Sequence, residues 1–95
     1  MHLITRKTLR LFWLQHPDSR TALERWSKII SQNNFDNFPQ LKATFKSADK
    51  VGNLVVFNIG GNKYRLIAAI HFNRHKVYIR HLLTHKQYDK GDWKR

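Results

Sequence analysis

The stretch VFNIGGNKYRLIAAI, residues 56–70, decides the fold, because two apolar runs flank a pair of glycines. Alternate side chains of a strand share a face, so Asn58 and Arg65 lie opposite the apolar set. Gly60 and Gly61 suit the positive φ angles of a two-residue hairpin turn, or of the start of a slightly longer one. The stretch predicts strands over residues 54–59 and 64–72, whose core side is formed by Phe57, Ile59, Tyr64 and Leu66.

A further strand is predicted over residues 77–83, where β-branched and aromatic residues are frequent. If the apolar sets of both strands share one face, a four-residue loop at residues 73–76 sets the register. That register places three pairs opposite each other: Phe72 with Val77, Ala69 with Arg80, and Arg65 with Thr84.

The N-terminal half predicts two helices. Residues 2–4 are apolar and fit a short first strand, and a helical period runs from Thr5 until Pro17. The second helix is capped by Asp18, Ser19 or Thr21. Thr21 would form a capping box with Glu24, three residues later. The two helices form an αα-hairpin. Residues 33–49 fit a connection with one helical turn around residues 41–45, and residues 85–95 fit a polar tail.

Composition predicts a single domain over residues 1–95 that binds a polyanion. The chain has 18 Lys and Arg against 6 Asp and Glu, a net charge of +12, which favours nucleic acid, a ribosome, an anionic membrane or an acidic protein as partner. The absence of cysteine excludes disulfides and thiolate zinc sites and fits a reducing cytoplasm. The apolar runs are far shorter than the roughly 18 residues of a membrane span, so we expect a soluble, intracellular protein.

Polar side chains gather on the sheet face that turns away from the helices. An antiparallel sheet often has one wet face without a function. Two arginines that converge with a tyrosine, close to Lys63, His85 and Lys86, favour a binding surface, and the small Ala69 between the arginines predicts a concave one. The predicted face carries Asn58, Arg65, His71, Tyr78, Arg80 and Thr84.

This face fits the chemistry of a phosphodiester. Arg65 and Arg80 offer planar forks that match phosphate oxygens. In RNA the 2′-hydroxyl can attack the adjacent phosphate once a base removes its proton. His85 and Tyr88 are the nearest titratable groups, although a lone histidine is as often structural. The six acids are dispersed along the sequence and the histidine pairs lack a third ligand, so we expect no metal and no cofactor.

The segments FNIGGNKYRLIA, VYIRHLLTH and YDKGDWK resemble the HigB-type toxins of bacterial toxin–antitoxin modules, within the RelE-like superfamily. The resemblance extends over essentially the whole chain. It implies an α+β, RelE-like fold of order β-α-α-β-β-β, with a mainly antiparallel sheet packed on an αα-hairpin. It also implies a ribosome-dependent mRNA endoribonuclease that a HigA-type helix-turn-helix antitoxin neutralises. The matching residues are Asn58, Gly60, Gly61, Asn62, Arg65, Tyr78, Arg80, Thr84, His85, Tyr88 and Asp89.

The resemblance suggests a role for each residue. Arg65 and Arg80 would hold the scissile phosphate, His85 would act as general base or acid, and Tyr88 would orient the 2′-hydroxyl or stack on a base. RelE itself has lysines on the second strand where this chain has Val56 and Asn58, so the identity of the base stays open. The expected RNA-binding residues are Asn58, Lys63, Tyr78, Thr84 and Lys86.

Two other interpretations remain. The same surface would suit a non-catalytic RNA- or ribosome-binding module. A DNA-binding regulator would need a recognition helix, but the apolar stripe of the Trp26 helix is expected in the core. We therefore expect operator DNA to be bound only through the antitoxin complex, and no membrane partner.

Overall fold

The computed structural model describes residues 1–94 and contains a mixed, five-stranded sheet of order β1-β5-β4-β3-β2. The short β1 runs parallel to β5, and the other neighbours are antiparallel. The expected α+β class with a mainly antiparallel sheet is confirmed. The strands are β1 (His2–Leu3), β2 (Asp49–Val51), β3 (Leu54–Ile59), β4 (Tyr64–His71) and β5 (Lys76–Thr84).

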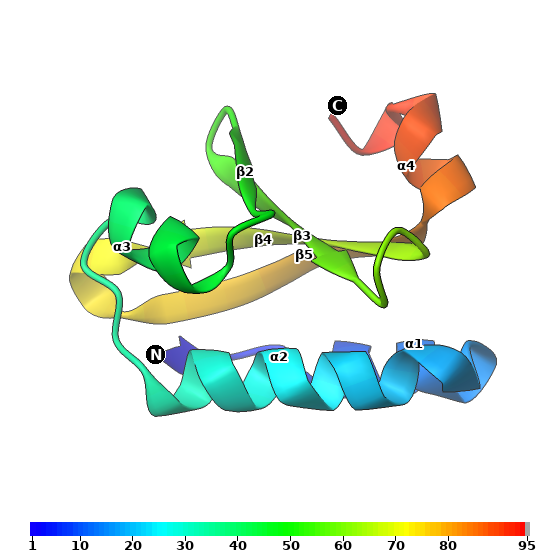
Figure 1. Cartoon of the computed structure of the whole chain (residues 1–95), viewed down its shortest axis with the longest axis horizontal. Helices are drawn as coiled ribbons and strands as arrows, with labels where there is room; N and C mark the ends of the chain where they lie inside the picture. Colours follow the sequence, from blue (N-terminus) through cyan, green and yellow to red (C-terminus); the bar gives the residue numbers. More distant parts are fainter. Residues whose placement is uncertain (95) are drawn as a thin grey trace.

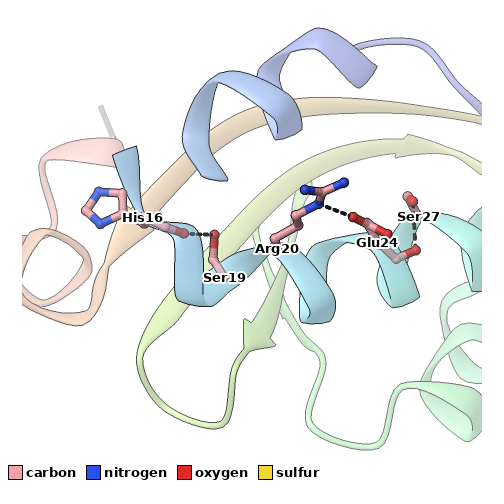
Figure 2. Close-up of polar contacts among 5 residues, drawn as sticks. All are labelled: His16, Ser19, Arg20, Glu24 and Ser27. Atoms are coloured by element: carbon pink, nitrogen blue, oxygen red, sulfur yellow. Dashed lines mark hydrogen bonds and ion pairs between the residues drawn. The ribbon is translucent and has the colours of Figure 1, made fainter. Parts of the chain in front are cut away.

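Helices α1 (Arg6–Gln15) and α2 (Arg20–Gln32) cover one face of the sheet as the expected αα-hairpin (Figure 1). A short 3₁₀ turn, η1 (Pro17–Ser19), joins them. The buried Ser19 occupies the N-cap position of α2, but its hydroxyl donates to the carbonyl oxygen of His16 at 2.7 Å (Figure 2). The capping box of Thr21 and Glu24 was wrong, because Thr21 lies inside α2 and Glu24 accepts from Arg20.

The core lies between these helices and the sheet. Trp26 of α2 packs edge-on against Phe57 of β3, with 5.3 Å between ring centroids. This contact confirms that Phe57 lies on the core side of its strand, as predicted. It also confirms that the apolar stripe of α2 that includes Trp26 lies in the core. Fully buried side chains in this layer include Leu23, Ile30, Leu41, Leu66 and Val77.

The two glycines of the opening stretch begin the longer of the predicted turns. Ile59 pairs with Tyr64, so residues 60–63 form a four-residue loop between β3 and β4. Gly60 and Gly61 have φ angles of 62° and 69°, in the region that favours glycine. The helical turn expected around residues 41–45 is present as the longer α3 (Phe38–Thr44), which the side chain of Asn37 caps, and β2 is an element that the sequence did not predict.

A β-bulge changes the predicted register between β4 and β5. Arg65 lies opposite Leu83, and Ala69 lies opposite Tyr78, with the shift between Ile67 and Ala68. The three predicted pairs were wrong for two reasons. Phe72 lies in the turn and His71 pairs with Lys76, so the register is already shifted by two residues between the turn and the bulge. The bulge then adds one residue to β5, which reverses the facing of the residues beyond it. Arg80 is the extra residue, Phe72 falls in the loop turn η2 (Phe72–Arg74), and Thr84 faces Tyr64.

The second sheet face is partly covered, contrary to the prediction of an open concave surface. The C-terminal residues form α4 (His85–Lys90) and the turn η3 (Asp92–Lys94), and they fold back over the sheet (Figure 1). Trp93 packs there on Val56 and Ile67. In the part of the chain that the structure describes, no helix has the length and apolar character that crossing a bilayer requires.

Candidate nucleic-acid site

Arg65 of β4 lies at the centre of the candidate site. Strand alternation turns it away from the main core, and its Cα pairs with those of Asn58 and Leu83. The side chain is 8% exposed because α4 lies across it. One guanidinium nitrogen, Nη1, donates to the carbonyl oxygen of Tyr64 at 3.2 Å, and Cζ lies 5.3 Å from the ring centroid of Tyr88.

Within residues 1–94, no carboxylate lies at ion-pair distance from Arg65. A guanidinium carries five N–H donors, and a buried cation without a counterion is costly. Arg65 therefore has the properties of an anion-binding residue whose ligand comes from outside the chain.

Helix α4 brings the predicted residue Tyr88 to this arginine. Thr84 caps the helix: its hydroxyl accepts from the backbone N–H of Gln87 at 3.2 Å, and the Gln87 side chain accepts from the N–H of Thr84 at 3.0 Å. The N–H of His85 donates to the carbonyl oxygen of Lys63 at 3.0 Å. These bonds attach the start of α4 to the β3–β4 loop and place Tyr88 on Arg65.

His85 makes a polar contact with Asp89 that spacing alone did not reveal. Its Nδ1 lies 2.8 Å from Oδ2 of Asp89, one helical turn later. A carboxylate that accepts from Nδ1–H leaves the lone pair of Nε2 available to take a proton. The sequence comparison included Asp89 in the family pattern but gave it no role. The four-residue spacing between His85 and Asp89 could have revealed the contact, but only if these residues had been predicted to form a helix.

Tyr88 is held by Trp93, a residue that the sequence interpretation placed in the tail without a role. The two rings stack with 5.2 Å between centroids and 14° between planes, and the indole N–H donates to the carbonyl oxygen of Tyr88 at 3.1 Å. Trp93 itself is 6% exposed. The ring of Tyr88 therefore has a fixed position between β4 and the chain end.

Lys63 and Tyr64 bind the carboxylate of Asp18. The distances are 3.2 Å from Lys63 Nζ and 2.6 Å from the Tyr64 hydroxyl. The hydrogen bond from Tyr64, followed by that from Lys63, lowers the pKa of Asp18, and the same carboxylate raises the pKa of Tyr64. This contact attaches the β3–β4 loop to the corner between α1 and α2.

The other predicted residues divide into two groups. Asn58 and Lys86 are exposed close to the Arg65 end of the sheet, and Thr84 serves as a helix cap. Tyr78 lies further along β5, and its ring is edge-on to that of His71, with 5.2 Å between the ring centroids. Arg80 is exposed at the bulge, beside a different hollow that is bounded by Trp93 and Lys94. The structure thus places Tyr88 on Arg65 and ties the backbone of His85 to Lys63, two residues before Arg65, whereas Arg80 and Tyr78 lie further along β5.

No group of three or more His, Asp or Glu side chains in residues 1–94 is arranged to hold a metal ion. The pair His85 and Asp89 stands alone at the start of α4. The chemistry that these side chains offer is anion binding by Arg65, proton transfer by His85, and hydrogen bonding or stacking by Tyr88.

Comparisons with known proteins agree with this chemistry. A family model described as "HigB_toxin, RelE-like toxic component of a toxin-antitoxin system" matches residues 19–91. The "mRNA interferase toxin HigB" of Escherichia coli (strain K12) is 40% identical over 92 residues, which cover 94% of this chain and 88% of that protein. The "mRNA interferase HigB" of Shigella flexneri has the same identity and coverage. The "mRNA interferase HigB" of Escherichia coli O6:H1 (strain CFT073) is 26% identical over 93 residues, 95% of this chain and 90% of that protein. The chain belongs to the HigB toxin family, the RelE-like toxic components of toxin–antitoxin systems, and its partner is an antitoxin.

Proposed function

We propose that this protein is an mRNA endoribonuclease toxin that cuts mRNA on translating ribosomes and so stops translation. The observation that carries the proposal is Arg65, a nearly buried cation that pairs with no carboxylate of residues 1–94, in contact with Tyr88 and close to the start of the helix that bears His85. The relatives named mRNA interferases supply the substrate class.

The proposed reaction needs no metal. Nε2 of His85 takes the proton of the 2′-hydroxyl while Asp89 holds the ring through Nδ1. The O2′–P bond forms, the P–O5′ bond breaks, and the leaving 5′-oxygen takes a proton from solvent. Arg65 stabilises the negative charge on the phosphoryl oxygens, and Tyr88 orients the 2′-hydroxyl or stacks on the base. The products are a 2′,3′-cyclic phosphate and a 5′-hydroxyl end.

The remaining predicted residues contact the RNA around this centre. Asn58, Lys63 and Lys86 lie at the same end of the sheet and bind backbone phosphates or sugars, while Arg80 and Tyr78 extend the surface along β5. Thr84 acts through the cap that holds α4 in place. A net charge of +12 favours a ribosomal location, since each phosphate contact adds affinity.

The cellular setting follows from this substrate. We propose that residues 1–95 form one domain that acts in the cytoplasm, where translating ribosomes are found. The antitoxin is of the HigA helix-turn-helix type, and operator DNA is bound only through the antitoxin complex. Tight, sequence-specific DNA binding by this chain alone would contradict that assignment.

Mapping of the RNA ends tests the proposal. Purified protein is incubated with ribosomes that carry a defined mRNA, with and without EDTA, and both new ends are identified. We expect a 2′,3′-cyclic or 3′-phosphate and a 5′-hydroxyl in both conditions. A 3′-hydroxyl that requires metal would contradict the mechanism. Ribosome binding without any cut would leave the chain as a non-catalytic RNA- or ribosome-binding module.

A further inference from the structure

A hollow on the C-terminal side of the sheet lies beyond the residues gathered at Arg65. It has a volume of about 460 Å³ and is bounded by Asn53, Leu54, Ala69, Arg80, Trp93 and Lys94. Figure 1 shows the β2–β3 turn and helix α4 on the same side of the sheet. We propose that this hollow binds the nucleotide next to the cleaved bond, with its phosphate on Arg80 and Lys94. This inference rests on the proposed ribonuclease function.

The charge of the hollow favours a phosphate. Arg80 is exposed because the bulge leaves it without a strand partner, and Lys94 lies across the hollow, with Nζ 5.6 Å from the centroid of the Trp93 ring. No acidic side chain lines the hollow, and no carboxylate of residues 1–94 lies at ion-pair distance from Arg80. Two cations that form no ion pair with residues 1–94 make a site for an anion, and the guanidinium fork matches phosphate oxygens.

The floor and rim of the hollow suit a nucleobase. The volume lies within the range of roughly 300–1,000 Å³ that is typical of small-molecule sites. Leu54 and Ala69, a Cα pair of β3 and β4, are half-buried apolar lining residues, and Trp93 lines the hollow beside them. The exposed Asn53 stands in the β2–β3 turn, where its amide can donate to and accept from a base edge.

The position relative to Arg65 places this nucleotide next to the scissile phosphate. Arg80 precedes Leu83, the Cα partner of Arg65, by three residues, which corresponds to about 10 Å along a strand. Trp93 separates the two sites, because it stacks on Tyr88 and also bounds the hollow. One RNA strand along this face therefore meets Arg65 and Arg80 with consecutive nucleotides.

The test compares Arg80→Gln, Lys94→Gln and Asn53→Ala with the matched control Arg74→Gln, an exposed arginine of the η2 turn outside the hollow. Affinity for a short, labelled 2′-O-methyl RNA, which lacks the attacking hydroxyl, is measured by anisotropy at several salt concentrations. We expect Arg80→Gln and Lys94→Gln to weaken binding about tenfold and to lower the salt slope by about one, and Arg74→Gln to change neither. Asn53→Ala should change the preference among the four bases at one position.

Cleavage assays on ribosomes give a second measurement. Arg80→Gln should raise KM far more than it lowers kcat, and the preference for the nucleotide beside the cut should weaken. If Arg80→Gln had the same RNA affinity and nucleotide preference as Arg74→Gln, the subsite would be overturned. A variant that lost affinity for the antitoxin but not for RNA would also overturn it. If wild-type protein binds the RNA through Arg80 but never cuts mRNA, the ribonuclease proposal fails and the binding site stands.

Discussion

The guanidinium of Arg65 lies over the ring of Tyr88, 5.3 Å from its centroid, and the indole of Trp93 stacks on the same ring. A strand, a helix and the final turn of the chain thereby fix one cation beside one phenol. Since Arg65 is only 8% exposed, little of its guanidinium is open to an anion while Tyr88 lies over it. Small shifts of α4 consequently change both the access to Arg65 and the position of Tyr88.

Removal of the Arg65 charge should abolish most of the activity. Arg65→Ala is expected to lower kcat for mRNA cleavage about 100-fold or more, because a preorganised charge on the phosphate is lost. Arg65→Lys keeps the charge but loses the fork, so it should recover a small part of the rate. Single-turnover cleavage on ribosomes measures both variants, and thermal melting shows whether each remains folded. A rate for Arg65→Ala within a fewfold of wild type would exclude Arg65 from the reaction.

His85 and Asp89 should act as a pair. His85→Ala is expected to lower kcat about 10²- to 10⁴-fold, the usual contribution of a positioned base. Asp89→Asn keeps a group that can accept from Nδ1–H but lacks the charge, so its loss should be smaller and the double variant should not lose more than His85→Ala alone. The pH dependence of kcat distinguishes a base from a residue that only binds. Independent, multiplicative losses in the double variant would show that the pair does not work as a unit.

The core side of the opening hairpin was predictable because strand alternation and two adjacent glycines act locally. The same argument failed one strand later. The bulge at Arg80 depends on how β5 packs against β4 and α4, so sequence parity placed Thr84 on the wrong face. Beyond the bulge Leu83 lies on the same face as Arg65, where it packs in the small cluster around Trp93.

Helix α4 was missed for a different reason. Its six residues are too few to show a helical period, and the polar sequence HKQYDK fits a tail equally well. Its start was visible as Thr84 and Gln87 in capping-box spacing. The consequence for the site was the role of Asp89, because a four-residue spacing places two side chains together on a helix and not in a tail.

Trp93 should position Tyr88 in addition to filling the second cluster. Trp93→Ala removes a nearly buried indole and is expected to cost about 3–5 kcal/mol of unfolding free energy. Trp93→Phe keeps an aromatic stack but loses the N–H bond to Tyr88, so it should cost about 1 kcal/mol. Denaturant unfolding measures both.

The activity of Trp93→Phe separates position from stability. We expect kcat to fall severalfold at a temperature where the variant is fully folded, because the Tyr88 ring becomes less constrained. The double variant Trp93→Phe with Tyr88→Phe is the control, since Trp93→Phe should have little further effect once the phenol is absent. Full kcat in folded Trp93→Phe would restrict Trp93 to packing.

Asp18 should make the stability of the protein depend on acid pH. The hydrogen bonds from Tyr64 and Lys63 lower its pKa from 3.8 in the folded state, so folding favours the charged form. The contribution of Asp18 to the free energy of unfolding is fully present at a pH above its pKa in the unfolded state. It is lost as the pH falls through its lower pKa in the folded state. Asp18→Asn should therefore melt at a lower temperature than wild type near neutral pH, and the difference should shrink below about pH 4. Tyr64→Phe, which keeps the ring of Tyr64 in the core, removes the larger cause of the shift and should show the same convergence with wild type in acid. A difference in melting temperature that stays constant from neutral to acid pH would mean that the contact between Asp18 and the β3–β4 loop does not favour the ionised carboxylate.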